Sequence, residues 1–258
     1  MNFRILCACL AFFACVGTES TYAYFTSSVE KYSESLSETS KNVTVDEFIN
    51  AAIVGNAGII QSFINQGGNP DIEKDYKGRT ALMLALKKGH TEIAKLLLEK
   101  SKNVDIQDKD GETALMYAIT SDRLEYKNGR GPDPEVRFAL IELLIEKSTN
   151  LNIQETEDGK TALIKIIDAD EFDDDYEHRF KIVKLLLKKG IDLNIQDNKG
   201  RTALIIALKK KYADIAKLLL QNGADPTIAE KKHGRTAWDY AERRGYSEIV
   251  EMIEKAQR

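Results

Sequence analysis

The chain has 258 residues, of which 43% are hydrophobic and 30% charged, and this composition excludes general disorder, a collagen-like fibre and a disulfide scaffold. Its 37 Lys+Arg and 41 Asp+Glu give a formal net charge of -4, so no global positive field attracts nucleic acid or an anionic membrane. We therefore expect neither as a partner, unless the chain carries a lipid anchor.

Residues 1–23 have the layout of a secretory signal peptide. Arg4 precedes an unbroken apolar run from Ile5 to Val16, which is shorter than the roughly 20 residues that span a bilayer. Small residues permit cleavage after Gly17 or after Ala23, and both positions stay open. We expect an exported, bacterial protein in the periplasm, at the cell surface or secreted.

The three cysteines, Cys7, Cys9 and Cys15, all lie in this segment, so cleavage would leave a chain without disulfides or cysteine ligands. Cys15 also allows an alternative, a bacterial lipoprotein signal in which this cysteine is lipidated. The residues before it fit that motif less well. Residues 24–44 are rich in Ser, Thr and Glu and are predicted to form a flexible polar linker.

From residue 45 to 258 the chain is organised by a repeat. The phrase Gly-x-Thr-Ala-apolar occurs five times, and its threonines are 33, 48, 41 and 34 residues apart. These spacings predict a unit of about 33 residues with insertions in two copies. The five threonines are Thr80, Thr113, Thr161, Thr202 and Thr236.

Each unit is predicted to form a helix, a turn, a second helix and a loop. Thr80 is a suitable N-cap, and Leu82 and Leu86 keep helical spacing until Gly89 ends the first helix. A weaker first copy starts at Asp46, which we expect to replace the threonine as the cap. Because no helix pair can bury its apolar face alone, the units must stack.

The repeat resembles the ankyrin repeat. Gly89-His90-Thr91-Glu92-Ile93 and Gly223-Ala224-Asp225 match the family phrase, although Ala81 and its equivalents stand in the usual proline position. The resemblance implies an all-α solenoid of about six stacked helix-turn-helix units with short hairpin loops. The repeats are expected near residues 46–78, 79–111, 112–159, 160–200, 201–234 and 235–258.

Two insertions separate the halves of a unit, at 120–136 and 168–179. In the first, Asp133-Pro134-Glu135 predicts a helix start, and Gly129-Arg130-Gly131 is interpreted as a loop because no strand precedes it to form a phosphate site. The second is strongly acidic, which raises the hypothesis of calcium binding. The alternation and glycine of an EF-hand are missing, which favours a solvated acidic loop.

The resemblance implies binding of another protein through the hairpin tips and first helices. The residue before each threonine would align Arg79, Lys160, Arg201 and Arg235 in a basic column broken by Glu112. This column is either an electrostatic strip for an acidic partner or charge that maintains solubility. The candidate partner-binding residues are Tyr76, Lys77, Arg79, Lys109, Asp110, Glu112, Lys160, Asn198, Lys199, Arg201, Lys232 and Arg235.

No catalytic pattern is recognisable in the sequence. His90, His178 and His233 lack zinc-ligand spacing, and there is neither a nucleophile elbow nor a P-loop. We expect a monomer without enzymatic activity, cofactor or metal, which acts outside the cytoplasm as a protein-binding scaffold. The alternative is a secreted effector or immunity-type factor that neutralises a toxin or a host protein.

Overall fold

The computed structural model describes residues 42–72, 74–120, 134–169 and 176–256. The predicted signal peptide, most of the predicted linker, the glycines at 129 and 131 and the acidic residues 170–175 lie outside these ranges. The helices belong to one compact unit, Thr44–Arg258.

The described residues form twelve α-helices in six pairs and no named strand. The predicted all-α solenoid of six helix pairs is therefore confirmed. The first helices of the pairs are α3 (Val45–Val54), α5 (Ala81–Lys87), α7 (Ala114–Thr120), α9 (Ala162–Asp168), α11 (Ala203–Lys209) and α13 (Ala237–Arg243). The second helices are α4 (Ala57–Asn65), α6 (Thr91–Lys100), α8 (Pro134–Lys147), α10 (Tyr176–Lys188), α12 (Ala213–Gln221) and α14 (Ser247–Ala256).

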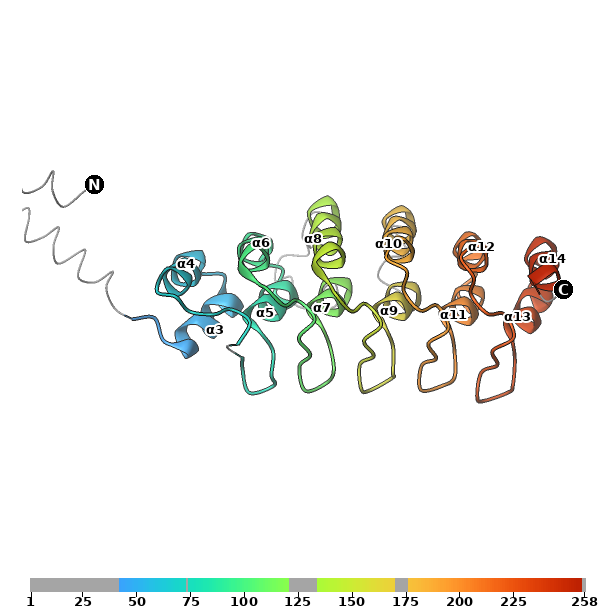
Figure 1. Cartoon of the computed structure of the whole chain (residues 1–258), viewed down its shortest axis with the longest axis horizontal. Coiled ribbons are helices and arrows are strands. Elements are labelled where there is room, and N and C mark those ends of the chain that lie inside the picture. The colour runs from blue at the N-terminus through green and yellow to red at the C-terminus, as the bar shows by residue number, and fades with distance from the viewer. Residues whose placement is uncertain (1–41, 73, 121–133, 170–175, 257–258) are drawn as a thin grey trace, which may run out of the picture. The chain divides into compact units, whose positions relative to one another are not determined.

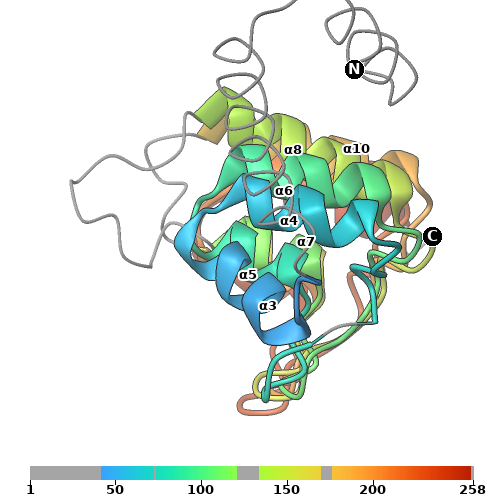
Figure 2. The ribbon, with the colours of Figure 1, turned by 90° about the vertical axis from the view of Figure 1, so that its left-hand side faces the viewer.

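The helices of Thr44–Arg258 stack in two rows, one of first helices and one of second helices (Figures 1 and 2). Each first helix packs against its own second helix and against the first helix of the next pair. The alanine that opens five of the first helices is at most 2% exposed, and its small side chain lets neighbouring helices approach closely. The apolar core is thus continuous from pair to pair.

The predicted threonine caps are present. Thr80, Thr161 and Thr202 accept the backbone N–H three residues later at 3.3–3.4 Å. The prediction for the first copy is wrong: Thr44, and not Asp46, caps α3. Thr44 and Glu47 form a reciprocal capping box, in which Glu47 Oε2 accepts the Thr44 N–H at 3.0 Å and Thr44 Oγ1 accepts the Glu47 N–H at 3.2 Å.

In the two repeats that contain insertions, the first helix ends differently from the first helices of the other repeats. After α5, Gly89 takes a φ of 71°, which is accessible to glycine at little cost. After α7 and α9, a buried arginine from the second helix binds the carbonyls at the helix end instead. Arg137 donates to Ala118 O and Ile119 O, and Arg179 to Ile166 O, Ile167 O and Ala169 O.

The insertions also lengthen the second helices. α8 and α10 have 14 and 13 residues, whereas the other second helices have 9 or 10. The predicted start of α8 at Pro134 is confirmed. The described ends of the predicted acidic loop are helical: Asp168 ends α9, residues 176–179 belong to α10, and Arg179 is fully buried.

Candidate partner-binding surface

Five hairpins precede the first helices α5, α7, α9, α11 and α13, and they project side by side from that row (Figure 1). We call residues 75–80, 108–113, 155–161, 197–202 and 230–236 the hairpin row. Main-chain hydrogen bonds join neighbours in it, from the N–H of each hairpin to a carbonyl of the preceding one. These bonds are Lys109 to Lys77, Thr156 to Asp110, Asn198 to Asp158 and Lys231 to Lys199, at 2.7–2.9 Å.

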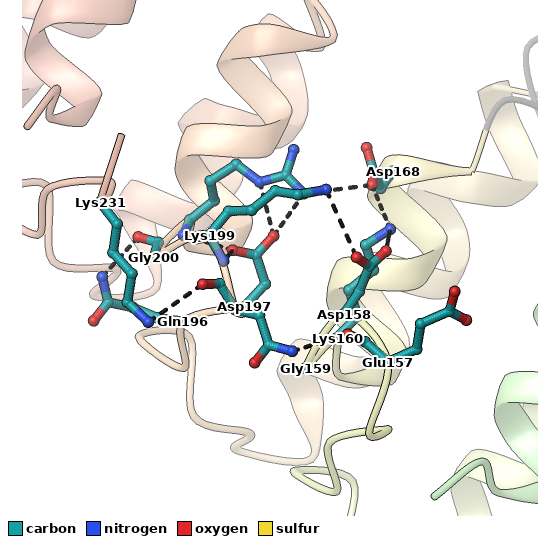
Figure 3. A network of polar contacts seen from close by, with 12 residues as sticks. Glu157, Asp158, Gly159, Lys160, Asp168, Gln196, Asp197, Lys199, Gly200 and Lys231 are labelled. Atoms are coloured by element: carbon teal, nitrogen blue, oxygen red, sulfur yellow. Dashed lines mark hydrogen bonds and ion pairs between the residues drawn. The ribbon is translucent and has the colours of Figure 1, made fainter. Parts of the chain in front are cut away.

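Glutamine side chains reinforce the row. Gln154 Nε2 donates to Gly159 O of its own hairpin and to Gln196 O of the next, at 2.6 and 3.0 Å. Gln196 repeats this arrangement with Gly200 O and Ala229 O, as Figure 3 shows for Gly200. Sequence reasoning missed these residues, although a glutamine four or five positions before the hairpin glycine recurs in three copies.

A carboxylate holds the turn of the first four hairpins from inside. Asp75, Asp108 and Asp197 accept the N–H groups of residues two and four positions later, and Glu155 accepts three such groups. Asp197 is 2% exposed, so its charge is available only to groups of the protein itself. Sequence reasoning also missed these acids, although an Asp or Glu recurs four or five residues before the residue that precedes the threonine.

The residues of the predicted basic column are less exposed than their positions in turns implied. Arg201 is buried, and Arg79, Lys160, Glu112 and Arg235 are half-buried. Arg79 Nη2 lies 2.6 Å from Asp75 Oδ2, and Glu112 lies 2.6 Å from Lys165 Nζ of the next repeat. The basic residues therefore occupy equivalent positions in successive repeats, but acidic side chains of the same protein neutralise several of them.

Exposure separates the remaining candidates from this column. Seven of the twelve candidate residues are exposed and all lie at hairpin tips: Tyr76, Lys77, Lys109, Asp110, Asn198, Lys199 and Lys232. The structure thus brings the tips together along one edge, and it places the residues before the threonines deeper, against the first helices.

An ion-pair network links the fourth and fifth repeats (Figure 3). Asp168, the last residue of α9, lies 2.9 Å from Lys160 Nζ and 3.9 Å from both Arg201 and Lys210. Asp158 pairs with Lys160 and Lys199 at 2.9 and 3.6 Å. The side-chain hydrogen bond from Lys160 lowers the pKa of Asp158 despite partial burial. Asp168 is therefore bound to cations and is not a free solvated carboxylate.

Neither a metal-ligand cluster nor a membrane-spanning helix occurs in the parts of the structure that are described. Those residues contain no group of three His, Cys, Asp or Glu side chains placed to hold a metal ion. A polar depression of about 200 Å³ follows α8 and α10, but the Ser148 hydroxyl there donates to Asp105 at 2.6 Å. Among the described helices, none is both long and apolar enough to span a membrane.

Comparison with known proteins identifies the repeat. The family model described as ankyrin repeats (3 copies) matches residues 48–127, 135–230 and 173–257. The potassium channel AKT2/3 of Arabidopsis thaliana is 28% identical over 66% of this chain and 18% of the channel. This chain spans less than a fifth of the length of the curated relatives it matches.

Solved structures share the same architecture. The ankyrin repeat protein EF0377 is 28% identical with a TM-score of 0.62, covering 82% of this chain and 98% of that one. A chain in the complex of the predatory endopeptidase Bd0816 from Bdellovibrio bacteriovorus with immunity protein Bd3460 is 23% identical. Its TM-score is 0.56, with 81% of this chain and 96% of that chain covered, and this second likeness shows the fold alone.

Proposed function

Because the chain belongs to the ankyrin repeat family, we propose that it is a non-catalytic module that binds another protein along the hairpin row and the first helices. The observation that carries this proposal is the hydrogen-bonded hairpin row, which holds seven exposed candidate side chains on one rigid edge. A preorganised edge loses little conformational entropy on binding.

Photo-crosslinking tests the binding surface. A photoreactive residue in place of Tyr76 or Lys232, both at exposed hairpin tips, should capture the partner in cells. The matched control is the same residue in place of Leu143, which is 41% exposed on the second helix α8. Capture from α8 alone, or from no position, would contradict the proposal.

We further propose that binding takes place outside the cytoplasm of a bacterium. The support is the sequence of residues 1–23, with Arg4 followed by the apolar run from Ile5 to Val16. Residues 1–44 fused to an alkaline phosphatase lacking its own signal should make the reporter active in the periplasm. Mass spectrometry of the exported chain would then distinguish cleavage after Gly17, cleavage after Ala23 and lipidation of Cys15.

A second candidate function is neutralisation of a toxin or host protein by an immunity-type or effector protein. It is favoured by the occurrence of this fold in the complex that contains immunity protein Bd3460. Co-expression with toxins encoded beside its gene tests this function. Restored growth that depends on Tyr76 or Lys232 would support it, whereas no rescue by the intact chain would reject it.

A further inference from the structure

Lys87 is a half-buried cation on the face of the first helices. It is the last residue of α5, and its Nζ lies 5.8 Å from the centre of the Tyr117 ring on α7. The Tyr117 hydroxyl donates to Asp108 Oδ2 at 2.7 Å, which fixes the ring. The lysine therefore rests on a firmly placed aromatic surface that joins the second and third repeats.

Lys87 lacks a counter-ion among the residues that the structure describes. In the described part of the chain, no carboxylate lies within ion-pair distance of its Nζ. Burial, and then the positive charges of Arg79 and Lys77, lower its pKa. The negative charge of Glu112 acts on Lys87, but the Glu112 carboxylate is paired with Lys165, whose Nζ lies 2.6 Å away.

Three other inner cations beside the hairpins have carboxylate partners within the chain. Arg79 is paired with Asp75, Arg201 with Asp197, and Lys160 with both Asp158 and Asp168. Desolvating an ion without a counter-ion is costly, so a surplus cation at a half-buried position gains more from an external anion than a paired one. Lys87 and Lys77 therefore carry positive charge that these carboxylates do not neutralise.

We propose that Lys87, with Lys77 as a second positive charge, binds a carboxylate in an acidic segment of the protein partner. This inference rests on the proposed function and names the chemistry of the partner at one part of its surface. Tyr76, adjacent to Lys77 and 77% exposed, supplies apolar contact area for the same segment.

The neighbouring charges favour an acidic protein segment over a nucleic acid. Asp75 accepts the Lys77 N–H, Asp108 binds the Tyr117 ring that Lys87 rests on, and the charge of Glu112 acts on Lys87. Duplex DNA carries about one negative charge per 1.7 Å of its axis. A polyphosphate backbone would bring several charges against these carboxylates. In an extended acidic peptide, successive side chains point to opposite faces, so one carboxylate can lie on Lys87 while its neighbours point away from the chain's own carboxylates.

The experiment uses the full chain and three fluorescein-labelled probes: an oligoglutamate peptide, an oligoglutamine peptide of equal length and a single-stranded oligonucleotide. Fluorescence anisotropy follows binding at low and high salt. Lys87→Met removes the charge and keeps a flexible helix-forming side chain, and Lys87→Arg keeps the charge. The matched control is Lys209→Met, because Lys209 ends α11 as Lys87 ends α5 and lies 6.0 Å from the Tyr240 ring, but is exposed.

We expect oligoglutamate to bind more tightly than oligoglutamine. Lys87→Met should weaken the binding of oligoglutamate by about fivefold or more at low salt, which is the range of one partly buried charge contact. Lys87→Arg and Lys209→Met should bind oligoglutamate as the unaltered chain does. Equal binding of the two peptides, or equal losses in Lys87→Met and Lys209→Met, would overturn the inference. Tighter, Lys87-dependent binding of the oligonucleotide would also overturn it and assign the site to nucleic acid.

The two proposals fail in different ways. If the photo-crosslinked partner is captured equally by Lys87→Met and the unaltered chain, the protein-binding function stands and the acidic segment is refuted. If oligoglutamate binding depends on Lys87 but no hairpin position captures a protein, the anion-binding site stands and the proposed function is refuted.

Discussion

Arg201 and Asp197 form an ion pair beneath the fourth hairpin of the row, with Arg201 Nε and Nη2 at 2.7 and 2.6 Å from Asp197 Oδ2. The other carboxylate oxygen, Oδ1, accepts the backbone N–H groups of Lys199 and Arg201. One buried acid thus fixes both the turn and the basic side chain that follows it. Asp75 and Arg79 repeat this arrangement in the first hairpin.

Replacing Asp197 by alanine should lower the free energy of unfolding by about 3 kcal/mol, because it leaves a buried guanidinium and two N–H groups without their acceptor. Urea unfolding followed by circular dichroism measures this loss. The control is Asp110→Ala, since Asp110 is an exposed hairpin acid, and it should change stability by less than about 0.5 kcal/mol. Similar losses in both variants would contradict the structural role of Asp197.

Asp75 should contribute to acid denaturation. Burial raises its pKa, but the hydrogen bonds and charge of Arg79 lower it more, so the net pKa lies below the ordinary 3.8. A carboxylate whose pKa is lower in the folded state stabilises the fold above its unfolded pKa, and this stability is lost as the pH falls through the folded pKa. Urea unfolding between about pH 5 and pH 2 should therefore show a shallower decline for Asp75→Asn than for the unaltered chain. Equal slopes would exclude this contribution.

Thr44→Ala should destabilise the first repeat by about 1 kcal/mol, because both members of the capping box lose their partner. Asp46→Ala is the matched control, since Asp46 is exposed in the first turn and makes no cap. Hydrogen exchange of the α3 amides reports the local change. Faster exchange in Asp46→Ala than in Thr44→Ala would restore Asp46 as the cap.

Arg179→Met should lower the free energy of unfolding by about 3 kcal/mol, because three carbonyls at the end of α9 lose their donors in a buried site. The Tyr212 ring, whose centre lies 4.6 Å from the guanidinium carbon, also loses its cationic contact. Thermal unfolding detects the loss. Lys181→Met on the same helix is the control, because its ion pair with Glu177 is at the surface and contributes little. If Arg179→Met left the free energy of unfolding unchanged, the carbonyls at the end of α9 would have other donors.

The repeat number, the order of the helices and the threonine caps of the second to fifth repeats could be predicted from the sequence. These features depend on local spacing: apolar residues at helical intervals, a capping hydroxyl and a glycine at the turn. The first cap was assigned wrongly to Asp46 because two suitable residues, Thr44 and Asp46, lie two positions apart. The capping box between Thr44 and Glu47 makes Thr44 the cap.

Which charges remain available to a partner depends on the tertiary structure. Arg201 and Lys87 are both cations in the sequence, yet Arg201 is paired with Asp197, whereas Lys87 rests on Tyr117 with no carboxylate of the described residues at ion-pair distance. Some pairs join residues far apart in the chain, such as Lys165 and Glu112, which are 53 positions apart. Ion pairing depends on distances of a few ångströms between side chains of neighbouring repeats, and stacking sets those distances.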